Sequence, residues 1–120
     1  MMRGMSSNRM KLGAVGEDIA AAELEAAGME ILDRNWRCCE GEIDIVARDG
    51  DVVVICEVKT RRGLGFGAPL ESITHEKLAR LRRLAVMWAQ EHHCRLPLRI
   101  DAIGILLPGP VITHERGVEL

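Results

Sequence analysis

Three residues near the middle of the chain have the types and spacing of a phosphodiesterase site. Asp44 is followed by Glu57, and Lys59 comes two residues after Glu57. Two carboxylates can bind Mg²⁺ together with water and the phosphate oxygens of a substrate. A lysine beside them could hold the attacking water and offset charge on the phosphate. The pattern therefore predicts metal-dependent hydrolysis of phosphodiester bonds.

The two acidic residues lie on segments that the sequence predicts as paired strands. Gly41–Arg48 alternates polar and apolar residues, and Val52–Thr60 is apolar and rich in β-branched residues. Both patterns are typical of strands. Between them, Asp49 and Gly50 are a strong signal for a tight hairpin turn. We therefore expect a β-hairpin to carry the candidate site.

The length of the turn decides which side chains share a face of this hairpin. With the two turn residues as the whole loop, Glu42 would face Glu57 and Asp44 would face Ile55. Because side chains alternate along a strand, the three acidic residues and Lys59 would project from one face. Asp44 would then lie diagonally from Glu57, roughly 7–8 Å away at the backbone and within the span of a bound cation. The opposite face would be uniformly apolar, with Ile43, Ile45, Val52, Val54, Cys56 and Val58.

The rest of the chain supplies elements that would cover and extend the hairpin. They are a helix from Ser7 or Asn8 to Ala27, a strand at Met29–Arg37, a loop at Arg61–Pro69, a helix from Thr74 to His93, a strand at Leu98–Leu107 and a short edge strand at Val111–Thr113. Without the edge strand, the order is α-β-β-β-α-β. This order predicts an α/β fold with a mixed sheet under helical cover.

Each predicted helix has an apolar side that would face the sheet. Gly13 and Gly16 interrupt the first helix, which indicates close approach of another segment. Apolar residues recur every three or four positions, at Leu12, Val15, Ile19, Ala22 and Ala26 in the first helix and at Leu78, Leu81, Ala85 and Trp88 in the second.

Length and composition limit the classes of protein that fit. The chain has 120 residues, so we expect a flexible tail at residues 1–10 and one domain at residues 11–120. The net charge of −2 argues against a generally basic DNA-coating protein. No apolar run approaches the length of a membrane span, and no signal peptide is recognisable. We therefore expect a cytoplasmic protein that does not bind membranes.

Several short motifs occur in an order that resembles one bacterial family. They are Gly13–Glu17, Arg34–Arg37, Gly41–Asp44, Glu57–Arg61, Phe66–Pro69, Lys77 and Arg99–Asp101. This pattern is similar to the YraN-like group of uncharacterised proteins, over about residues 11–105. The fold of that group resembles archaeal Holliday junction resolvases and the restriction-endonuclease-like, or PD-(D/E)XK, superfamily. The resemblance implies the same α-β-β-β-α-β core.

The resemblance also implies a role for each acidic residue. Asp44 and Glu57 would be ligands of Mg²⁺ or Mn²⁺, Lys59 would be the catalytic lysine, and Glu17 would be an acid that the first helix directs at the site. Each residue has a simpler explanation, because strand carboxylates and lysines are often only exposed. A glutamate early in a helix is also favoured by the helix dipole alone. Glu42 is either a second-shell helper of the metal ligands or a surface residue.

Basic residues near the candidate site could bind nucleic acid. Arg61 and Arg62 follow the catalytic lysine, and Lys77, Arg80 and Arg83 recur along one side of the second helix. Cations at such positions contact phosphates when they lie beside a phosphodiester site. Away from such a site, they are usually solvated.

Two further groups of residues have structural explanations. Arg99 and Asp101 lie two apart on one strand face and are expected to pair with each other. A zinc site is the alternative for the histidines and cysteines, formed by His92, His93 and Cys94 with Cys38 or Cys39. Reduced cysteines more often serve as small core residues.

The sequence therefore favours a Mg²⁺- or Mn²⁺-dependent endonuclease that acts on DNA, with branched and single-stranded DNA as candidate substrates. The alternative is a nucleic-acid-binding module that keeps the nuclease fold with little or no turnover. A homodimer would match the two-fold symmetry of branched DNA.

Overall fold

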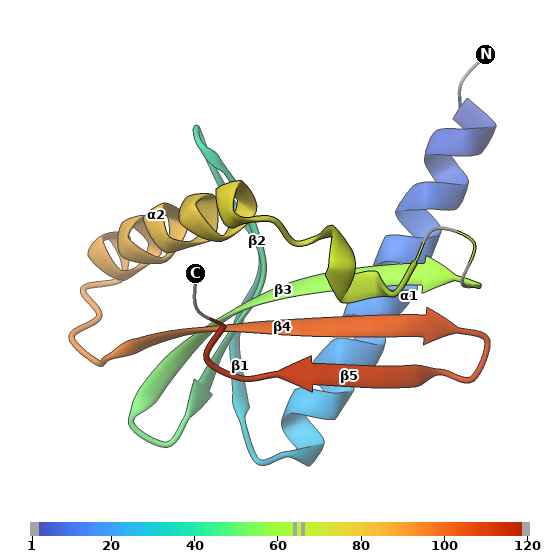
Figure 1. Ribbon diagram of the computed structural model, residues 1–120. Coiled ribbons are helices and arrows are strands. Elements are labelled where there is room, and N and C mark those ends of the chain that lie inside the picture. The colour runs from blue at the N-terminus through green and yellow to red at the C-terminus, as the bar shows by residue number, and fades with distance from the viewer. Residues whose placement is uncertain (1–2, 64, 66, 119–120) are drawn as a thin grey trace.

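A five-stranded sheet forms the centre of the protein, and one helix covers each of its faces (Figure 1). The computed structural model describes residues 3–63, 65 and 67–118. Its elements are α1 (Arg3–Ala26), β1 (Glu30–Cys38), β2 (Gly41–Asp49), β3 (Val52–Arg62), the 3₁₀ helix η1 (Pro69–Ser72), α2 (His75–Glu91), β4 (Leu98–Leu107) and β5 (Val111–Glu115). No helix among these residues combines the length and the apolar character needed to span a membrane.

The strands lie in the order β1-β2-β3-β4-β5 across the sheet. Neighbouring strands are antiparallel except β3 and β4, which are parallel. A parallel pair needs a crossover connection, and η1 and α2 provide it. The predicted α/β fold, mixed sheet and α-β-β-β-α-β order are confirmed, and β5 is the predicted edge strand with two more residues.

Most element boundaries agree with the predictions, and the differences have local causes. β4 occupies the predicted range Leu98–Leu107. α2 begins after Thr74, whose hydroxyl accepts a hydrogen bond from the Lys77 N–H at 3.2 Å. β3 continues to Arg62 instead of ending at Thr60, because its pairing with β4 continues to that residue. The loop predicted at Arg61–Pro69 therefore begins two residues later than expected, and η1 begins at its last residue, Pro69.

The start of α1 also differs from the prediction. The helix begins at Arg3, before Ser7 and Asn8, the two residues expected to cap it. Both residues therefore lie inside the helix and neither is its cap. Gly28, with a left-handed φ of 91°, follows the end of the helix as expected. The division of the chain at residue 10 stays a prediction.

The buried side of α1 agrees with the predicted apolar stripe at Ile19, which packs against the core, but differs from it elsewhere. Val15 is 47% exposed, and Ala22 and Ala26 are exposed as well. A Cβ on Gly16 would collide with the hydroxyl of Thr60 and would lie 2.9 Å from its Cβ. Because α1 approaches β3 this closely, small residues face the sheet together with one leucine: Gly16, Ala20, Ala21 and Leu24.

Two apolar layers form the core, one on each side of the sheet. α1 packs against the first layer and α2 against the second. The predicted buried side of α2 is confirmed, and Leu84 belongs to it as well as Leu78, Leu81, Ala85 and Trp88. The central strands are therefore apolar on both faces, as is usual for strands under helical cover. Among the described residues, the one buried charged side chain of these strands is Asp101 of β4.

β2 separates from β3 halfway along its length. Its pairing with β3 ends at Ile45 and Cys56, whereas its pairing with β1 continues to Gly41. The free part of the β1–β2 hairpin bends toward α2 (Figure 1). As a result, Ile43 packs in the α2 layer although Ile45 packs in the α1 layer. The prediction of one uniformly apolar hairpin face is therefore wrong at Ile43.

Asn35 marks the same bend on β1. In the register of β1 and β2 it lies opposite Asp44. Its φ of 52° is left-handed, a conformation that asparagine adopts more readily than most residues. Beyond the bend, the Trp36 indole N–H donates to a Glu91 carboxylate oxygen at 2.7 Å, which ties the hairpin to the end of α2.

The contact between α1 and β3 predicts opposite effects for two glycine substitutions in one helix. Gly13→Ala should raise the free energy of unfolding by roughly 1 kcal/mol, because nothing lies within 4 Å of the new Cβ and alanine favours helix. Gly16→Ala should lower it by about 1–3 kcal/mol, because the helix must move away from Thr60. Denaturant titration measures both. A stabilising Gly16→Ala would contradict the close approach.

Candidate active site

The candidate site lies where β2 leaves β3, and its register differs from the predicted one. Asp49 pairs with Val52, so the hairpin loop is Gly50-Asp51 and not Asp49-Gly50. Gly50 has a φ of 60°, the left-handed conformation that the first position of such a turn requires. The predicted pairs of Glu42 with Glu57 and of Asp44 with Ile55 are therefore wrong.

The corrected register brings the two predicted metal ligands closer together. It shifts the pairing by two residues, which keeps every side chain on its predicted face. Continued beyond the last pair, Ile45 with Cys56, it places Asp44 level with Glu57. Asp44 and Glu57 line the same hollows of the surface together with Lys59. The structure thus brings these three residues together.

Asp44 sits at the point of separation of the two strands. Its carboxylate accepts a hydrogen bond from the Val58 N–H at 2.8 Å, in place of the main-chain partner that β2 no longer supplies. Burial raises the pKa of Asp44, the hydrogen bond from Val58 opposes that rise, and the charge of Glu42 adds to it. The side chain is thereby fixed in position but energetically costly to ionise.

Glu57 and Lys59 project from the same side of β3. The Lys59 Nζ lies 3.6 Å from Glu57 Oε1, and the two side chains are 28% and 19% exposed. Burial and then the negative charge of Asp44 raise the pKa of Glu57 to about 7, against the opposing effect of Lys59. A single lysine therefore does not neutralise this pair of carboxylates.

Glu17 reaches the site from α1, as predicted. It lines one hollow with Asp44 and Glu57. Its Oε1 atom is buried and has no hydrogen-bond partner among the described residues. Burial and then the charge of Asp44 raise the pKa of Glu17, while Arg34 acts to lower it. An orphaned carboxylate oxygen beside two other acids is suited to a cation.

Two surface hollows meet at the candidate site. The α2-side hollow, of about 250 Å³, is lined by Glu42, Asp44, Glu57, Lys59, Lys77, Arg80, Leu81 and Leu84. The α1-side hollow, of about 680 Å³, is lined by Leu12, Gly13, Glu17, Asp44, Glu57, Val58, Lys59, Thr60, Arg61 and Arg62. They share Asp44, Glu57 and Lys59, so these residues form a wall between two spaces.

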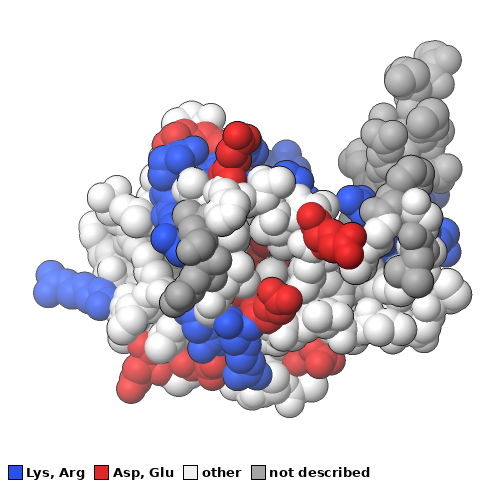
Figure 2. All heavy atoms as spheres, in the orientation of Figure 1, with Lys and Arg blue, Asp and Glu red and all other residues white. Residues whose placement is uncertain are grey.

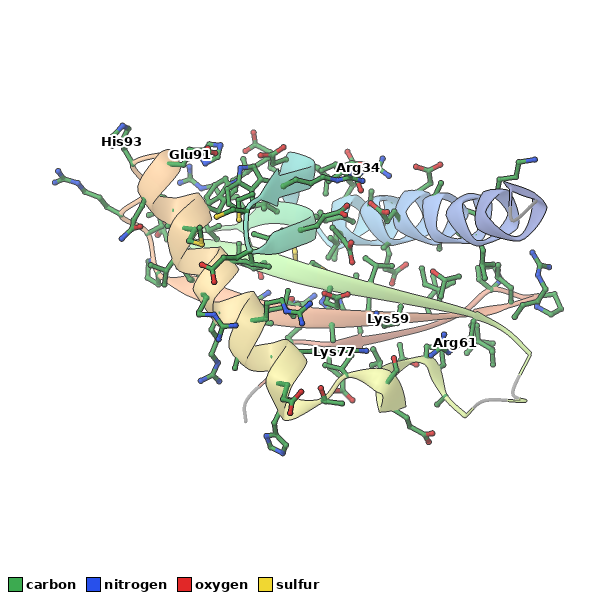
Figure 3. The ribbon with its side chains drawn as sticks, turned by 90° about the horizontal axis from the view of Figure 1, so that it is seen from above. Arg34, Lys59, Arg61, Lys77, Glu91 and His93 are labelled. Atoms are coloured by element: carbon green, nitrogen blue, oxygen red, sulfur yellow. The ribbon has the colours of Figure 1, made fainter. Side chains whose placement is uncertain are left out.

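The predicted nucleic-acid-binding residues divide between the two hollows. Lys77 and Arg80 line the α2-side hollow, and Arg61 and Arg62 line the α1-side hollow. In Figure 3, Lys59 lies between Lys77 and Arg61. Arg83 instead pairs with a carboxylate of the hairpin, Glu40, at 3.7 Å. Figure 2 shows basic and acidic side chains interleaved on the face it presents, so cationic residues gather locally and not in one broad surface.

Some lining residues carried no chemical signal in the sequence. Leu81 and Leu84 form part of the α2-side hollow, and Leu12 and Thr60 part of the other. The two α2 leucines also belong to the core layer of that helix. Their second role follows only from the position at which the helical cover ends.

The remaining predicted residues have structural partners. Glu42 lines the α2-side hollow and pairs with Arg37 at 3.4 Å. The predicted pairing of Arg99 with Asp101 is confirmed, at 2.8 and 3.0 Å. Burial acts to raise the pKa of Asp101, but hydrogen bonds from Arg99, His114 and the backbone outweigh it and lower that pKa. Phe66, part of one motif, lies outside the described residues.

The donor set at the site fits a hard divalent cation held with the help of water and substrate. In the described part of the chain, no three His, Cys, Asp or Glu residues form a complete metal site, and this includes the zinc site considered above. Mg²⁺ commonly uses one or two carboxylates and takes its other ligands from water and phosphate. Asp44 and Glu57 could supply these carboxylates, and the orphaned oxygen of Glu17 lies in the same hollow.

Comparison with known proteins places the chain in a family. A model of the uncharacterised protein family UPF0102 matches residues 16–105. The chain belongs to this family. The UPF0102 protein of Acidothermus cellulolyticus is 52% identical over 130 residues, covering 97% of this chain and 98% of the relative. The UPF0102 protein of Streptomyces coelicolor is 55% identical over 116 residues, covering 92% and 89%.

UPF0102 membership confirms the predicted YraN-like uncharacterised family. The matched range contains every motif named above except the first three residues of Gly13–Glu17. The relation to the PD-(D/E)XK superfamily stays a prediction, because the UPF0102 proteins compared carry no assigned activity in their names. The site therefore has to be judged from its own geometry.

The raised pKa of Glu57 predicts that replacing it with neutral glutamine stabilises the folded protein, and that the gain in stability grows with pH. Below pH 4.5 the carboxyl is protonated in both the folded and the unfolded chain. As pH rises to about 7, the unfolded chain ionises first and the folded state loses stability. In EDTA, Glu57→Gln should therefore become more stable than wild type by about 1–3 kcal/mol between pH 4.5 and pH 8.

Denaturant titration across this pH range measures the effect. Glu30→Gln, at an exposed position of β1, is the matched control for removal of one negative charge. Its stability should stay within about 0.5 kcal/mol of wild type. A Glu57→Gln variant that parallels wild type at every pH would show that the pKa of Glu57 is not raised in the folded protein.

Proposed function

We propose that this UPF0102 protein is a divalent-metal-dependent nuclease that hydrolyses phosphodiester bonds of DNA. The observation that carries the proposal is the wall formed by Asp44, Glu57 and Lys59 between two hollows that contain further cations. Burial makes the ionised forms of these two carboxylates unfavourable, so they contribute little to the stability of the fold. They suit a site that gathers a metal ion and a phosphate.

The residues of the site would divide the chemistry among them. Asp44 and Glu57 would hold Mg²⁺ or Mn²⁺, which when bound supplies positive charge to the phosphate and lowers the pKa of water. Asp44 enters the reaction already oriented by the Val58 N–H. Lys59 would donate hydrogen bonds to the attacking water and to a phosphate oxygen. Hydrolysis joins the water oxygen to phosphorus, breaks one P–O ester bond and leaves a phosphate monoester and a hydroxyl.

The substrate is proposed from the charges around the site. The cations of both hollows would contact phosphates, and no base-reading element is recognisable in the sequence. Cleavage should therefore depend on the shape of the DNA and not on its sequence. Branched and single-stranded DNA are the forms to compare first with duplex DNA.

Substitution of the wall residues tests the proposal. In Mn²⁺ or Mg²⁺, Asp44→Asn and Lys59→Met should each reduce DNA cleavage by at least about 100-fold. Asp44→Asn removes a charged ligand of the metal ion, and Lys59→Met removes the positive charge beside the reacting phosphate. Asp51→Asn is the control, since Asp51 lies in the turn of the same hairpin with its side chain 95% exposed. It should cleave at the wild-type rate. Four-way junctions, flaps, single strands and duplexes are assayed together, with and without EDTA.

The outcomes separate the nuclease from its alternatives. Cleavage that survives both wall substitutions would come from a contaminating enzyme and would overturn the proposal. DNA binding by wild-type protein without cleavage in either metal ion would instead favour a nucleic-acid-binding module with the same fold. Binding by such a module should weaken with salt, because the cations would replace counterions of the phosphates.

A further inference from the structure

The two hollows place cations on both sides of the candidate catalytic wall. Lys77 belongs only to the α2-side hollow, Arg61 only to the α1-side hollow, and Asp44, Glu57 and Lys59 to both. The view in Figure 3 agrees, with Lys59 between Lys77 and Arg61. A phosphate beside the wall would therefore have a cation available in each direction.

The cation in the α2-side hollow is held in place before any ligand binds. Lys77 is half-buried, and its Nζ donates to the Ser72 carbonyl oxygen at 2.9 Å. The hydroxyl of Ser72 in turn donates to the Pro69 carbonyl oxygen at 2.9 Å, which fixes the end of η1. A lysine restrained in this way loses less side-chain entropy when it binds a phosphate.

The cation in the α1-side hollow is held differently. Arg61 lies two residues beyond Lys59 on the same side of β3, about 7 Å further along the strand. Its Nε atom is buried and has no hydrogen-bond partner among the described residues. Because Arg61 lines the hollow, its guanidinium would form charge-assisted hydrogen bonds with a phosphate bound there.

The hollows offer little to the bases of a nucleic acid. Among the described residues, none of those that line them is aromatic. Trp36 and Trp88 instead pack in the α2 core layer. Stacking on aromatic side chains is the usual way to hold unpaired bases. Recognition by these hollows must therefore act through the phosphates.

We infer that the site formed by Asp44, Glu57 and Lys59 cuts within a continuous DNA strand and binds the phosphates on both sides of the broken bond. This inference rests on the proposed function. Lys77 forms one flanking phosphate subsite, and Arg61 forms the other. The substrate class is thus an internal phosphodiester with a charged neighbour in each direction. A free strand end is not required.

Backbone neutralisation tests the two subsites separately. The substrate is a single-stranded oligodeoxynucleotide with one methylphosphonate placed on the 5′ or the 3′ side of the cleaved bond. With wild-type protein, each replacement should slow cleavage by about 10–100-fold, as expected for loss of a hydrogen bond to a charged group. Lys77→Met should abolish the sensitivity to one side only, and Arg61→Met the sensitivity to the other side only.

Arg82→Met is the matched control, because this exposed arginine of α2 lines neither hollow. It should keep both sensitivities. Circular dichroism and thermal unfolding establish that all three variants are folded. A covalently closed single-stranded circle provides a second readout, and wild-type protein should cut it as fast as a linear strand.

The results distinguish failure of this inference from failure of the proposed function. If no DNA cleavage depends on Asp44, the proposed function and this inference are both overturned. If Asp44-dependent cleavage occurs but the circle resists, or if Lys77→Met and Arg61→Met lose sensitivity on the same side or on neither, only the two-sided subsites are overturned.

Discussion

The hydrogen bond from the Val58 N–H to the Asp44 carboxylate is the interaction on which the arrangement of the site depends. β2 leaves β3 at this point, and a main-chain donor of β3 would otherwise lose its partner. The carboxylate satisfies that donor and so lets the β1–β2 hairpin bend toward α2. The bend opens the space in which Glu57 and Lys59 project. One side chain thus serves both as the end of a sheet ladder and as part of the candidate site.

The fold around this bond keeps the polar residues at the margin of the core. Both faces of the central strands are apolar, and each is closed by a helix. Asp101 is buried in β4 with Arg99 and His114 as its partners, whereas the acidic residues of the candidate site lie where β2 no longer covers β3. Their burial is nevertheless sufficient to raise the pKa of Glu57 to about 7. Such a site opposes stability, and the two core layers must offset its cost.

The sequence predicted the parts of this structure that depend on local patterns. Strand alternation predicted that Asp44 and Glu57 share a face. This prediction is correct although the register was wrong, because an error of two residues leaves every side chain on the same face. The error arose because Asp49-Gly50 and Gly50-Asp51 are both two-residue loops, and Gly50 can supply a left-handed φ in either. Only the pairing of Asp49 with Val52 separates them. The buried side of α1 was only partly predicted, because Ala20–Ala22 are three consecutive alanines and the sequence does not tell which of them faces the sheet. The two-hollow arrangement was also missed, since it depends on contacts distant in sequence, such as Trp36 with Glu91.

The separation of β2 from β3 also affects how the protein meets other chains. Val53 and Gly63 donate their N–H groups toward the β4 side of β3. The alternation of a strand therefore turns the main-chain groups of Thr60 toward the side that β2 has left. A free strand edge of this kind is a template for aggregation, and natural proteins protect it with charged side chains. Lys59, Arg61 and Arg62 provide that protection, so the cations suited to phosphates also keep this sheet from extending into a neighbouring molecule.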